Sequence, residues 1–322
     1  MGTAVGLSVG QVLPFLNSLR NAGYEGDVVL FVDWALGRAL RRYQWEARVY
    51  LIRARQWLPF KLRLLGHPRA LRFLWMPLQT ALFLGLRAVD SMPLSQQARF
   101  ALRSGLAKLI YTPMEARFVR YHAFLTSHRY ARVLLTDVRD VLFQSDPFRW
   151  LPSSGLAVSD ETASYTIATE PHNAEWITRA YGPEALEQIG RNRVSCVGVT
   201  YGDGEAILRY LRLFLDELMS LRPTAAGIGG ADTAIHNMLL GTGRLEPVRH
   251  LAPLASPVAT LNAVSPGDVT LSATGRLLNR DGSEPSVLHQ YDRIPGMRGK
   301  LLQSLASSPR RDHWGGLPRL SD

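Results

Sequence analysis

Two aspartates follow a short apolar segment near the middle of the chain. The segment is Val133–Leu135, and Asp137 and Asp140 come after it with Arg139 between them. A short apolar run with a β-branched first residue is typical of a strand buried on both faces, as in parallel sheets. Carboxylates at the carboxyl end of such a strand lie where open α/β sheets bind their ligands. These residues mark a candidate ligand site, although Asp137 could instead cap the next turn while Asp140 pairs with Arg139.

The longer segment Arg132–Phe148, RVLLTDVRDVLFQSDPF, resembles the metal-binding segment of GT-A glycosyltransferases, which use nucleotide-sugar donors and carry an Asp-x-Asp motif. Both have an apolar strand, then two acids, then a turn of the Asp-Pro-Phe kind. The resemblance implies that the acids hold Mn²⁺ or Mg²⁺ against the donor diphosphate, which suits the preference of hard cations for oxygen ligands. Here the acids are three residues apart, so a turn must begin at Asp137 before both can converge. Either Asp137 or Asp140, or both, could bind the metal.

A histidine late in the chain extends the resemblance. His289 follows the strand-like pair Val287-Leu288, and the resemblance implies that it completes the metal shell. Imidazole is a common ligand of Mn²⁺, whereas Mg²⁺ prefers oxygen. The resemblance also gives Arg139 a role at a donor phosphate oxygen, since a guanidinium matches phosphate geometry.

A second segment of the family is matched after the glycine-rich run Gly227–Gly230. Residues 231–237, ADTAIHN, are similar to the Asp-Gln-x-x-x-Asn helix start of GT-A enzymes, with Thr at the position of Gln. The resemblance implies that Asp232 is the base that deprotonates the acceptor hydroxyl if the reaction inverts the anomeric centre. If configuration is retained, Asp232 would only hydrogen-bond the sugar, and in either case His236 and Asn237 would contact the sugar or the acceptor. An aspartate at this place is otherwise an ordinary helix cap.

Five further residues are candidates for binding the donor: Asp33, Arg117, Tyr121, Ser195 and Gly198. Asp33 ends a predicted strand in the region where GT-A enzymes hold the base and ribose, although a strand-end aspartate also serves as a cap. Arg117 and Tyr121 are neighbours on one helix and could face the donor or form a surface pair. Ser195 and Gly198 lie in a run of small residues similar to the Asn-x-Gly segment near the donor sugar, where small side chains let a ligand approach the backbone.

The elements that must position these residues alternate between strands and helices. Apolar segments with strand character lie at 3–8, 27–33, 47–54, 133–135, 155–159, 194–200 and 286–289. Helical periodicity marks 11–22, 35–42, 114–127, 173–181, 183–189, 205–221 and the segment that begins at 231. The first strand, helix and strand form a βαβ unit, which implies a parallel sheet with a right-handed crossover. We therefore expect an α/β fold, GT-A-like or Rossmann-like, with a mainly parallel mixed sheet, helices on both faces and a basic helical insertion.

Positive charge is concentrated in one part of the chain. Between Trp34 and Arg120 there are sixteen Lys and Arg against three acids, whereas the whole chain has a net charge of +10. Residues 56–111 in this region mix aromatic and basic side chains, as an interfacial helix on anionic lipid does. They could equally be a long insertion that packs its aromatic residues on the main domain. No nucleic-acid-binding motif accompanies the charge, so nucleic acid is not an expected partner.

Residues 1–295 are expected to form one GT-A-like domain around the insertion at 56–111, with 296–322 as a basic tail that frays. The single cysteine, Cys196, has no partner for a disulfide within the chain. Neither a signal-peptide pattern nor an apolar run long enough to span a bilayer is recognisable. These features predict a cytoplasmic protein, either soluble or peripheral on the inner face of the membrane.

The predicted function is metal-dependent transfer of a sugar from a nucleotide diphosphate donor to a hydroxyl acceptor. The basic aromatic insertion suggests an acceptor at the membrane surface, such as a lipid-linked or cell-envelope glycan. The alternative is a non-catalytic membrane-surface binding protein with a degenerate transferase fold, because the Asp-x-Asp, Asn-x-Gly and Asp-Gln patterns are all altered here.

Overall fold

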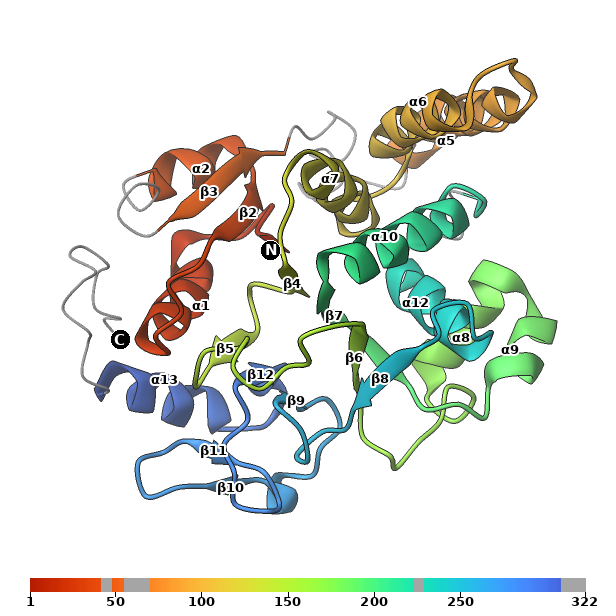
Figure 1. Cartoon of the computed structure of the whole chain (residues 1–322). Coiled ribbons are helices and arrows are strands. Elements are labelled where there is room, and N and C mark those ends of the chain that lie inside the picture. The colour runs from red at the N-terminus through yellow and green to blue at the C-terminus, as the bar shows by residue number, and fades with distance from the viewer. Residues whose placement is uncertain (42–47, 55–69, 223–228, 308–322) are drawn as a thin grey trace.

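The computed structural model describes residues 1–41, 48–54, 70–222 and 229–307, with the backbone alone at 70–76 and 305–307 (Figure 1). Strands and helices are mixed along this part of the chain, and the strands form several small sheets. The α/β class predicted from the alternation is confirmed.

A parallel sheet of three strands forms at the start of the chain. Its strands, in spatial order, are β1 (Gly2–Thr3), β2 (Val28–Val32) and β3 (Val49–Arg53), with α1 (Val9–Asn21) and α2 (Trp34–Leu40) between them in sequence. A helical crossover carries the chain back to the same edge of the sheet, which is why these strands are parallel. β1 is shorter than the strand predicted at 3–8, because the chain turns at Gly6, where φ is +82°, and Ser8 then begins α1 with a capping box.

A mixed sheet of four strands holds the middle of the chain. Its strands, in spatial order, are β4 (Arg132–Thr136), β7 (Ser195–Asp203), β6 (Leu156–Asp160) and β8 (Val248–Leu251). β7 is antiparallel to both β4 and β6, whereas β6 and β8 are parallel. Two consecutive helices that pack together, α8 (Pro171–Tyr181) and α9 (Pro183–Ile189), return the chain to the edge where β6 ends, so β7 runs back across the sheet.

Hydrogen bonds from Met1 join these two sheets. Its amine donates to Leu134 O at 2.7 Å, and its carbonyl accepts from Thr136 N at 2.9 Å, which is the pattern of a parallel pair. β1 therefore lies between β2 and β4. The strand order through both sheets is β3-β2-β1-β4-β7-β6-β8, in which β7 runs opposite to its neighbours.

A smaller sheet brings the last strand beside the segment that follows β4. β12 (Val287–His289) pairs antiparallel with β5 (Val141–Phe143) and parallel with β9 (Val258–Thr260). A hairpin of β10 (Thr270–Leu271) and β11 (Leu277–Leu278) is separate, and short 3₁₀ helices lie at Val89–Ser91, Pro266–Asp268 and Tyr291–Arg293. The β5–β12 pairing places His289 opposite Val141, next to Asp140.

Helices cover both faces of the joined sheets. On one face, Phe15 of α1 belongs to the same core as Leu134 of β4. The other face is covered by α7 (Pro113–Ser127), α10 (Gly204–Leu218) and α12 (Ala231–Gly241). There Val133 faces the helices, as alternation along β4 requires, and Phe118 stacks on Phe214 with ring centroids 3.7 Å apart. The predicted coverage of both faces is confirmed.

The predicted basic insertion is helical where it is described. α5 (Ala70–Ala88) and α6 (Gln96–Ile110) form a hairpin that projects from the body at the upper right of Figure 1. Residues 56–69 of the insertion lie outside the described residues. None of the described helices is both long and apolar enough to cross a membrane.

The first part of the predicted frayed tail is a helix. α13 (Met297–Ser307) buries Met297 and Leu301, which are four residues apart and so face the same core. Basic and small residues around these two positions hide the helical spacing in the sequence, which is why the expectation for 297–307 is wrong. Residues 308–322 lie outside the described residues.

Candidate metal centre

Asp137, Asp140 and His289 converge at the carboxyl end of β4. Each offers one ligand atom, and the three atoms lie within 4.8 Å of one another. The chain turns directly after Asp137, as the three-residue spacing requires, and Gln290 N donates to Asp140 O at 2.8 Å. The turn and the β5–β12 pairing thus bring both acids to the histidine. This group could hold a metal ion.

The burial of Asp140 and His289 favours a bound cation. His289 is fully buried, and its Nε2 has no hydrogen-bond partner, although it lies 3.6 Å from Asp137 Oδ2. An unpartnered buried nitrogen costs free energy unless a ligand meets it. Ligand distances of about 2.1 Å place two donors up to about 4.2 Å apart, so small side-chain movements would close the group around an ion. Two carboxylates and an imidazole suit Mn²⁺ and other transition metals better than Mg²⁺.

Gly198 of β7 leaves the space beside these donors open. A Cβ atom at this position would lie 2.6 Å from His289 Nε2 and 2.7 Å from Asp137 Oδ2, closer than side chains approach one another. The Gly198 carbonyl accepts from Asp137 N at 2.8 Å, which fixes the first acid to β7. The small residue predicted to lie near a ligand is therefore next to two of the candidate metal ligands.

Arg117 holds Asp137 from the side of α7. Its guanidinium lies 2.5 Å from Asp137 Oδ1 and 3.0 Å from Asp232 Oδ2, and its side chain is 3% exposed. Asp137 thus uses Oδ1 for the arginine and turns Oδ2 toward His289. Burial alone would lower the pKa of Arg117, but the two carboxylates raise it overall. Burial alone would raise the pKa of Asp137, but Arg117 and His289 hold it well below its usual range.

A further buried acid, near Asp232, has no distinctive signal in the sequence. Glu115, in the first turn of α7, is buried and accepts a hydrogen bond from Thr112 Oγ1. Burial, and after it the charge of Asp232, raises the pKa of Glu115 to about 7. An acid in the first turn of a helix ordinarily complements the helix dipole at the surface. The charge that acts on Glu115 here comes from Asp232 of α12, which is distant in the sequence.

Cys196 contacts His289 on the side of its other ring nitrogen. The Cys196 Sγ lies 3.7 Å from His289 Nδ1, and burial raises the pKa of the thiol. Burial alone would lower the pKa of His289, but Cys196 and the carboxylates of Asp137 and Asp140 raise it well above its ordinary value. A buried thiol with a raised pKa is a poor nucleophile, so Cys196 supports the histidine rather than reacting itself.

Arg139 lies at the rim of the ligand group. Its guanidinium is 3.3 Å from Asp140 Oδ2 and 3.6 Å from Asp292 Oδ2, and its side chain is 45% exposed. The predicted alternative, in which Asp140 pairs with Arg139, is thus observed, but the pair forms within the ligand group. A half-exposed guanidinium beside metal ligands can meet an incoming phosphate.

Three other predicted residues form a buried network at the start of β7. Asn237 Nδ2 donates to Ser195 O, and Asn237 Oδ1 accepts from Ser195 N, both at 2.9 Å. His236 lies between Ser195 Oγ and Tyr210 OH, at 3.1 and 3.0 Å, and burial lowers its pKa to about 3. These contacts hold α12 against β7, so the network engages protein partners.

Asp33 is held by backbone donors, whereas the buried hydroxyl of Tyr121 has no hydrogen-bond partner among the described residues. Asp33 is the N-cap of α2 and accepts from Leu36 N at 3.0 Å, and it accepts from Gly6 N at 2.9 Å. The cap role considered for Asp33 is therefore observed. Tyr121 is buried on α7, where its ring packs against Phe31 of β2.

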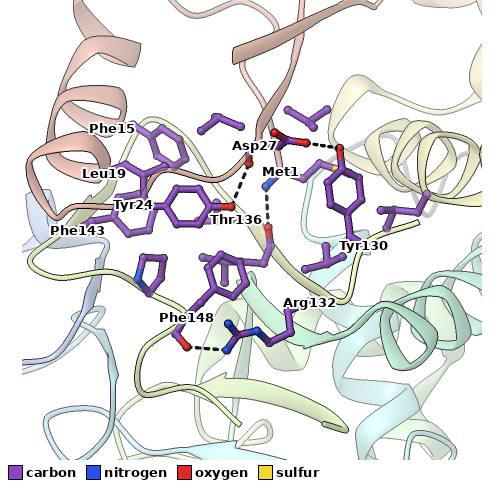
Figure 2. Close-up of a pocket in the computed structure, with 16 residues that line it drawn as sticks. Met1, Phe15, Leu19, Tyr24, Asp27, Tyr130, Arg132, Thr136, Phe143 and Phe148 are labelled. Atoms are coloured by element: carbon purple, nitrogen blue, oxygen red, sulfur yellow. Dashed lines mark hydrogen bonds between the residues drawn. The ribbon is translucent and has the colours of Figure 1, made fainter. Parts of the chain in front are cut away.

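Hollows among the described residues lie away from the ligand group. A cavity of about 50 Å³ lies at the amino ends of β2 and β4. Figure 2 shows Phe148 on one side of it and the hydrogen bond that Tyr130 donates to Asp27 Oδ2. Another cavity, of about 510 Å³, is lined by Asp160 and His250, whose Nδ1 lies 2.8 Å from Asp160 Oδ1. The ligand group lies at the carboxyl end of β4 and lines neither cavity.

No protein-family model matches this chain, and no curated protein matches it either. Function is therefore inferred from the side chains themselves. The decisive features are the ligand group at the end of β4, the guanidinium on each side of it and the glycine that leaves it open.

We expect the ligand group to bind Mn²⁺ in solution. Asp140→Asn and His289→Gln should each weaken Mn²⁺ binding by at least about tenfold, because each removes a ligand and even the outer partners of ligands contribute about 10- to 100-fold. The affinity, measured by titration calorimetry, should also rise with pH through the pKa of His289. The raised pKa keeps a proton on the imidazole that the cation must displace.

Asp292→Asn is the matched control for these variants. It removes a carboxylate that contacts Arg139 beside the group but offers no ligand atom to it. Its Mn²⁺ affinity should match that of the unmodified protein. An equal loss of Mn²⁺ affinity in Asp292→Asn would show that binding depends on local charge rather than on these ligands. Unchanged Mn²⁺ affinity in His289→Gln would show that His289 is not a ligand.

Glu115 should make the fold less stable as pH rises. Its pKa increases from 4.5 to about 7 on folding, so its contribution to stability is complete below about pH 4.5 and is lost as the pH passes 7. Glu115→Gln should remove this loss, on the order of 1–3 kcal/mol. Urea unfolding at about pH 4.5 and about pH 8 measures it. Glu175→Gln, at an exposed acid, is the control, and its stability should change with pH as that of the unmodified protein does. If Glu115→Gln showed that same pH dependence, the Glu115 carboxyl would be ionised throughout, which would contradict the prediction.

Proposed function

We propose that this protein is a metal-dependent glycosyltransferase of the GT-A type, which moves a sugar from a nucleotide diphosphate to a hydroxyl acceptor. The observation that carries the proposal is the position of the ligand group. Asp137, Asp140 and His289 lie at the carboxyl end of β4, whose neighbour on one side is β1. Open α/β sheets bind their ligands at the carboxyl ends of such strands.

The strand order supports this position. β3, β2, β1 and β4 follow the 3-2-1-4 order of doubly wound nucleotide-binding sheets. α1, which follows β1, covers one face of the sheet, whereas α7, which leads into β4, covers the other. The side on which the chain crosses therefore changes between β1 and β4. In doubly wound sheets the crevice at this change holds the nucleotide.

The residues around the ligand group would divide the work of binding the donor. Asp137, Asp140 and His289 would hold the cation, which when bound neutralises negative charge on the leaving diphosphate. Arg139, half exposed at the rim, would bind a phosphate oxygen. Arg117 would keep Asp137 ionised and oriented from its buried position on α7.

Asp232 is the candidate base for the acceptor hydroxyl. Burial raises its pKa, which moves the carboxylate toward the range in which it accepts a proton near neutral pH. Its Oδ2 accepts from Arg117, and its Oδ1 accepts from Thr233 N at 3.0 Å. An ionised carboxylate has about four lone-pair sites, so the acceptor hydroxyl would meet one that remains. In a reaction that retains configuration, Asp232 would only hydrogen-bond the sugar.

Gly198 and Asp33 would shape the donor site on either side. Gly198 leaves room for the donor sugar beside the metal ligands. Asp33 lies just beyond the carboxyl end of β2 and has lone pairs beyond its two backbone contacts, which a ribose hydroxyl could use. The buried residues would position these groups rather than touch the sugar; they are Tyr121, Ser195, His236 and Asn237.

Titration calorimetry with UDP and with GDP, each with and without Mn²⁺, tests the proposal. We expect one of the nucleotides to bind, and to bind at least about tenfold more tightly when Mn²⁺ is present, because a cation held by the ligand group would neutralise charge on the diphosphate. Asp140→Asn should lose this Mn²⁺ dependence, whereas Asp292→Asn should keep it. Release of nucleotide diphosphate from the matching sugar nucleotide should fall by at least about 100-fold in Asp137→Asn.

Two results would contradict the proposal in different ways. If nucleotide affinity did not depend on Mn²⁺, or if no nucleotide bound, the ligand group would not be the binding site of the diphosphate. Tight binding of nucleotide and Mn²⁺ without any consumption of sugar nucleotide, including hydrolysis, would instead favour a non-catalytic binding protein with a transferase-like fold. Turnover that survives in Asp137→Asn would remove the metal role assigned to that residue.

A further inference from the structure

The hairpin of α5 and α6 carries an apolar surface that no other described segment covers. Residues 73–86 contain no charged side chain. Leu86 is fully buried in the core on the inner side of α5, yet Leu78 and Leu84 are 43% and 62% exposed. Pro77, Ala81 and Ala88, which follow the helical spacing of Leu84, are exposed too. A helix that is apolar on its outer side as well as its inner side can bind an apolar partner through the outer side.

Exposed apolar side chains are concentrated in this part of the molecule. Eight large apolar residues are exposed among the described residues, and four of them belong to the hairpin: Leu78, Leu84, Met92 and Leu102. Scattered exposed apolar residues are ordinary on a soluble protein, but a gathered set marks an interaction site.

The positive charge of the hairpin favours an anionic partner. Between residues 77 and 110 the basic side chains are Arg87, Arg99, Arg103 and Lys108, and the single acid is Asp90. Asp90 is paired with Arg103 at 3.2 Å, so it adds no free negative charge. Leucine and methionine beside uncompensated cations match the boundary of an anionic bilayer, where acyl chains meet phosphate head groups.

The body of the protein holds the hairpin in a fixed position. Tyr111 OH donates to Leu221 O at 2.9 Å, and the Arg212 guanidinium of α10 lies 3.6 Å from the centre of the Phe100 ring. Within the hairpin, Gln79 Nε2 donates to Ile110 O at 3.0 Å. These contacts use the inner sides of the helices, so no described residue covers the outer face of α5, and the hairpin projects from the molecule (Figure 1).

We propose that the α5–α6 hairpin docks this protein on the surface of an anionic lipid bilayer. Leu78, Leu84, Met92 and Leu102 enter the boundary between head groups and acyl chains, and Arg87 and Lys108 meet lipid phosphates. The hairpin lies on the surface and does not cross, since no described helix is long and apolar enough to span. The inference is independent of sugar transfer, because it uses no residue of the ligand group.

Sedimentation with lipid vesicles tests the docking. The full-length protein should sediment with vesicles of phosphatidylcholine and phosphatidylglycerol and much less with vesicles of phosphatidylcholine alone. A Leu78→Gln, Leu84→Gln double variant should lower the partition coefficient by at least about tenfold, because two apolar side chains no longer enter the bilayer. Arg87→Gln with Lys108→Gln should reduce the difference between the two kinds of vesicle, and added salt should do the same.

Trp150→Gln is the matched control. Trp150 follows β5, outside the hairpin, and is 58% exposed, close to the exposure of Leu84. This variant should bind vesicles as the unmodified protein does. The proposal is overturned if the protein does not bind anionic vesicles or if the double leucine variant binds them as the unmodified protein does. It is also overturned if Trp150→Gln loses as much vesicle binding as the double leucine variant. Self-association that depends on Leu78 and Leu84, without vesicle binding, would assign the same surface to a protein partner and also overturn it.

All substituted positions are on the surface, so the variants should keep the fold. Circular dichroism and Mn²⁺ titration of each variant check this separately from lipid binding. Unchanged Mn²⁺ affinity together with lost vesicle binding would show that docking and the metal group are independent. Loss of both properties in the leucine variant would mean that the substitutions disturb the fold, and it would overturn the assignment of these side chains to the membrane.

Discussion

The candidate site depends on a buried arginine shared by two carboxylates. Arg117 joins Asp137 at the end of β4 to Asp232 at the start of α12, and its side chain is almost completely buried. A buried carboxylate that loses its partner is strongly destabilised, commonly by about 3–5 kcal/mol, so the arginine favours the ionised form of both acids. The same contact orients Asp137, because one oxygen is taken by Arg117 and the other is left facing His289. One side chain thus links the helix α7, the central strand and the proposed acceptor base.

Around this bridge, buried residues fix the geometry and half-exposed residues are free to meet a ligand. The polar atoms of Asn237 and His236 hydrogen-bond to Ser195 and Tyr210. These bonds hold α12 against β7 and keep Asp232 in place. Arg139, by contrast, is held at the rim by acids on one side and solvent on the other. This arrangement is what a site for a charged donor requires, because rigid support limits the reorganisation that binding demands.

Local patterns were enough to predict most elements and the order of the ligand residues, but not the pairing that completes the site. The apolar spacing of α10 and the short apolar run of β4 depend on neighbouring residues, so they can be read directly from the sequence. The turn after Asp137 was also expected from the three-residue spacing. The meeting of Asp140 and His289 depends on β5, a strand of three residues whose pairing with β12 has no local signal. The reversed direction of β7, the effect of Asp232 on Glu115 and the packing of α13 likewise depend on segments far apart in the chain.

The central claim is that Asp137, Asp140 and His289 hold a divalent cation against the diphosphate of a nucleotide. A crystal structure of the protein with Mn²⁺ and the tighter-binding nucleoside diphosphate, with the metal located by anomalous scattering, tests it most directly. One manganese should lie within roughly 2.0–2.6 Å of His289 Nε2, of a carboxylate oxygen of at least one of the two aspartates and of a diphosphate oxygen. Manganese bound elsewhere, or a diphosphate at the amino ends of the strands in the cavity of Figure 2, would contradict it.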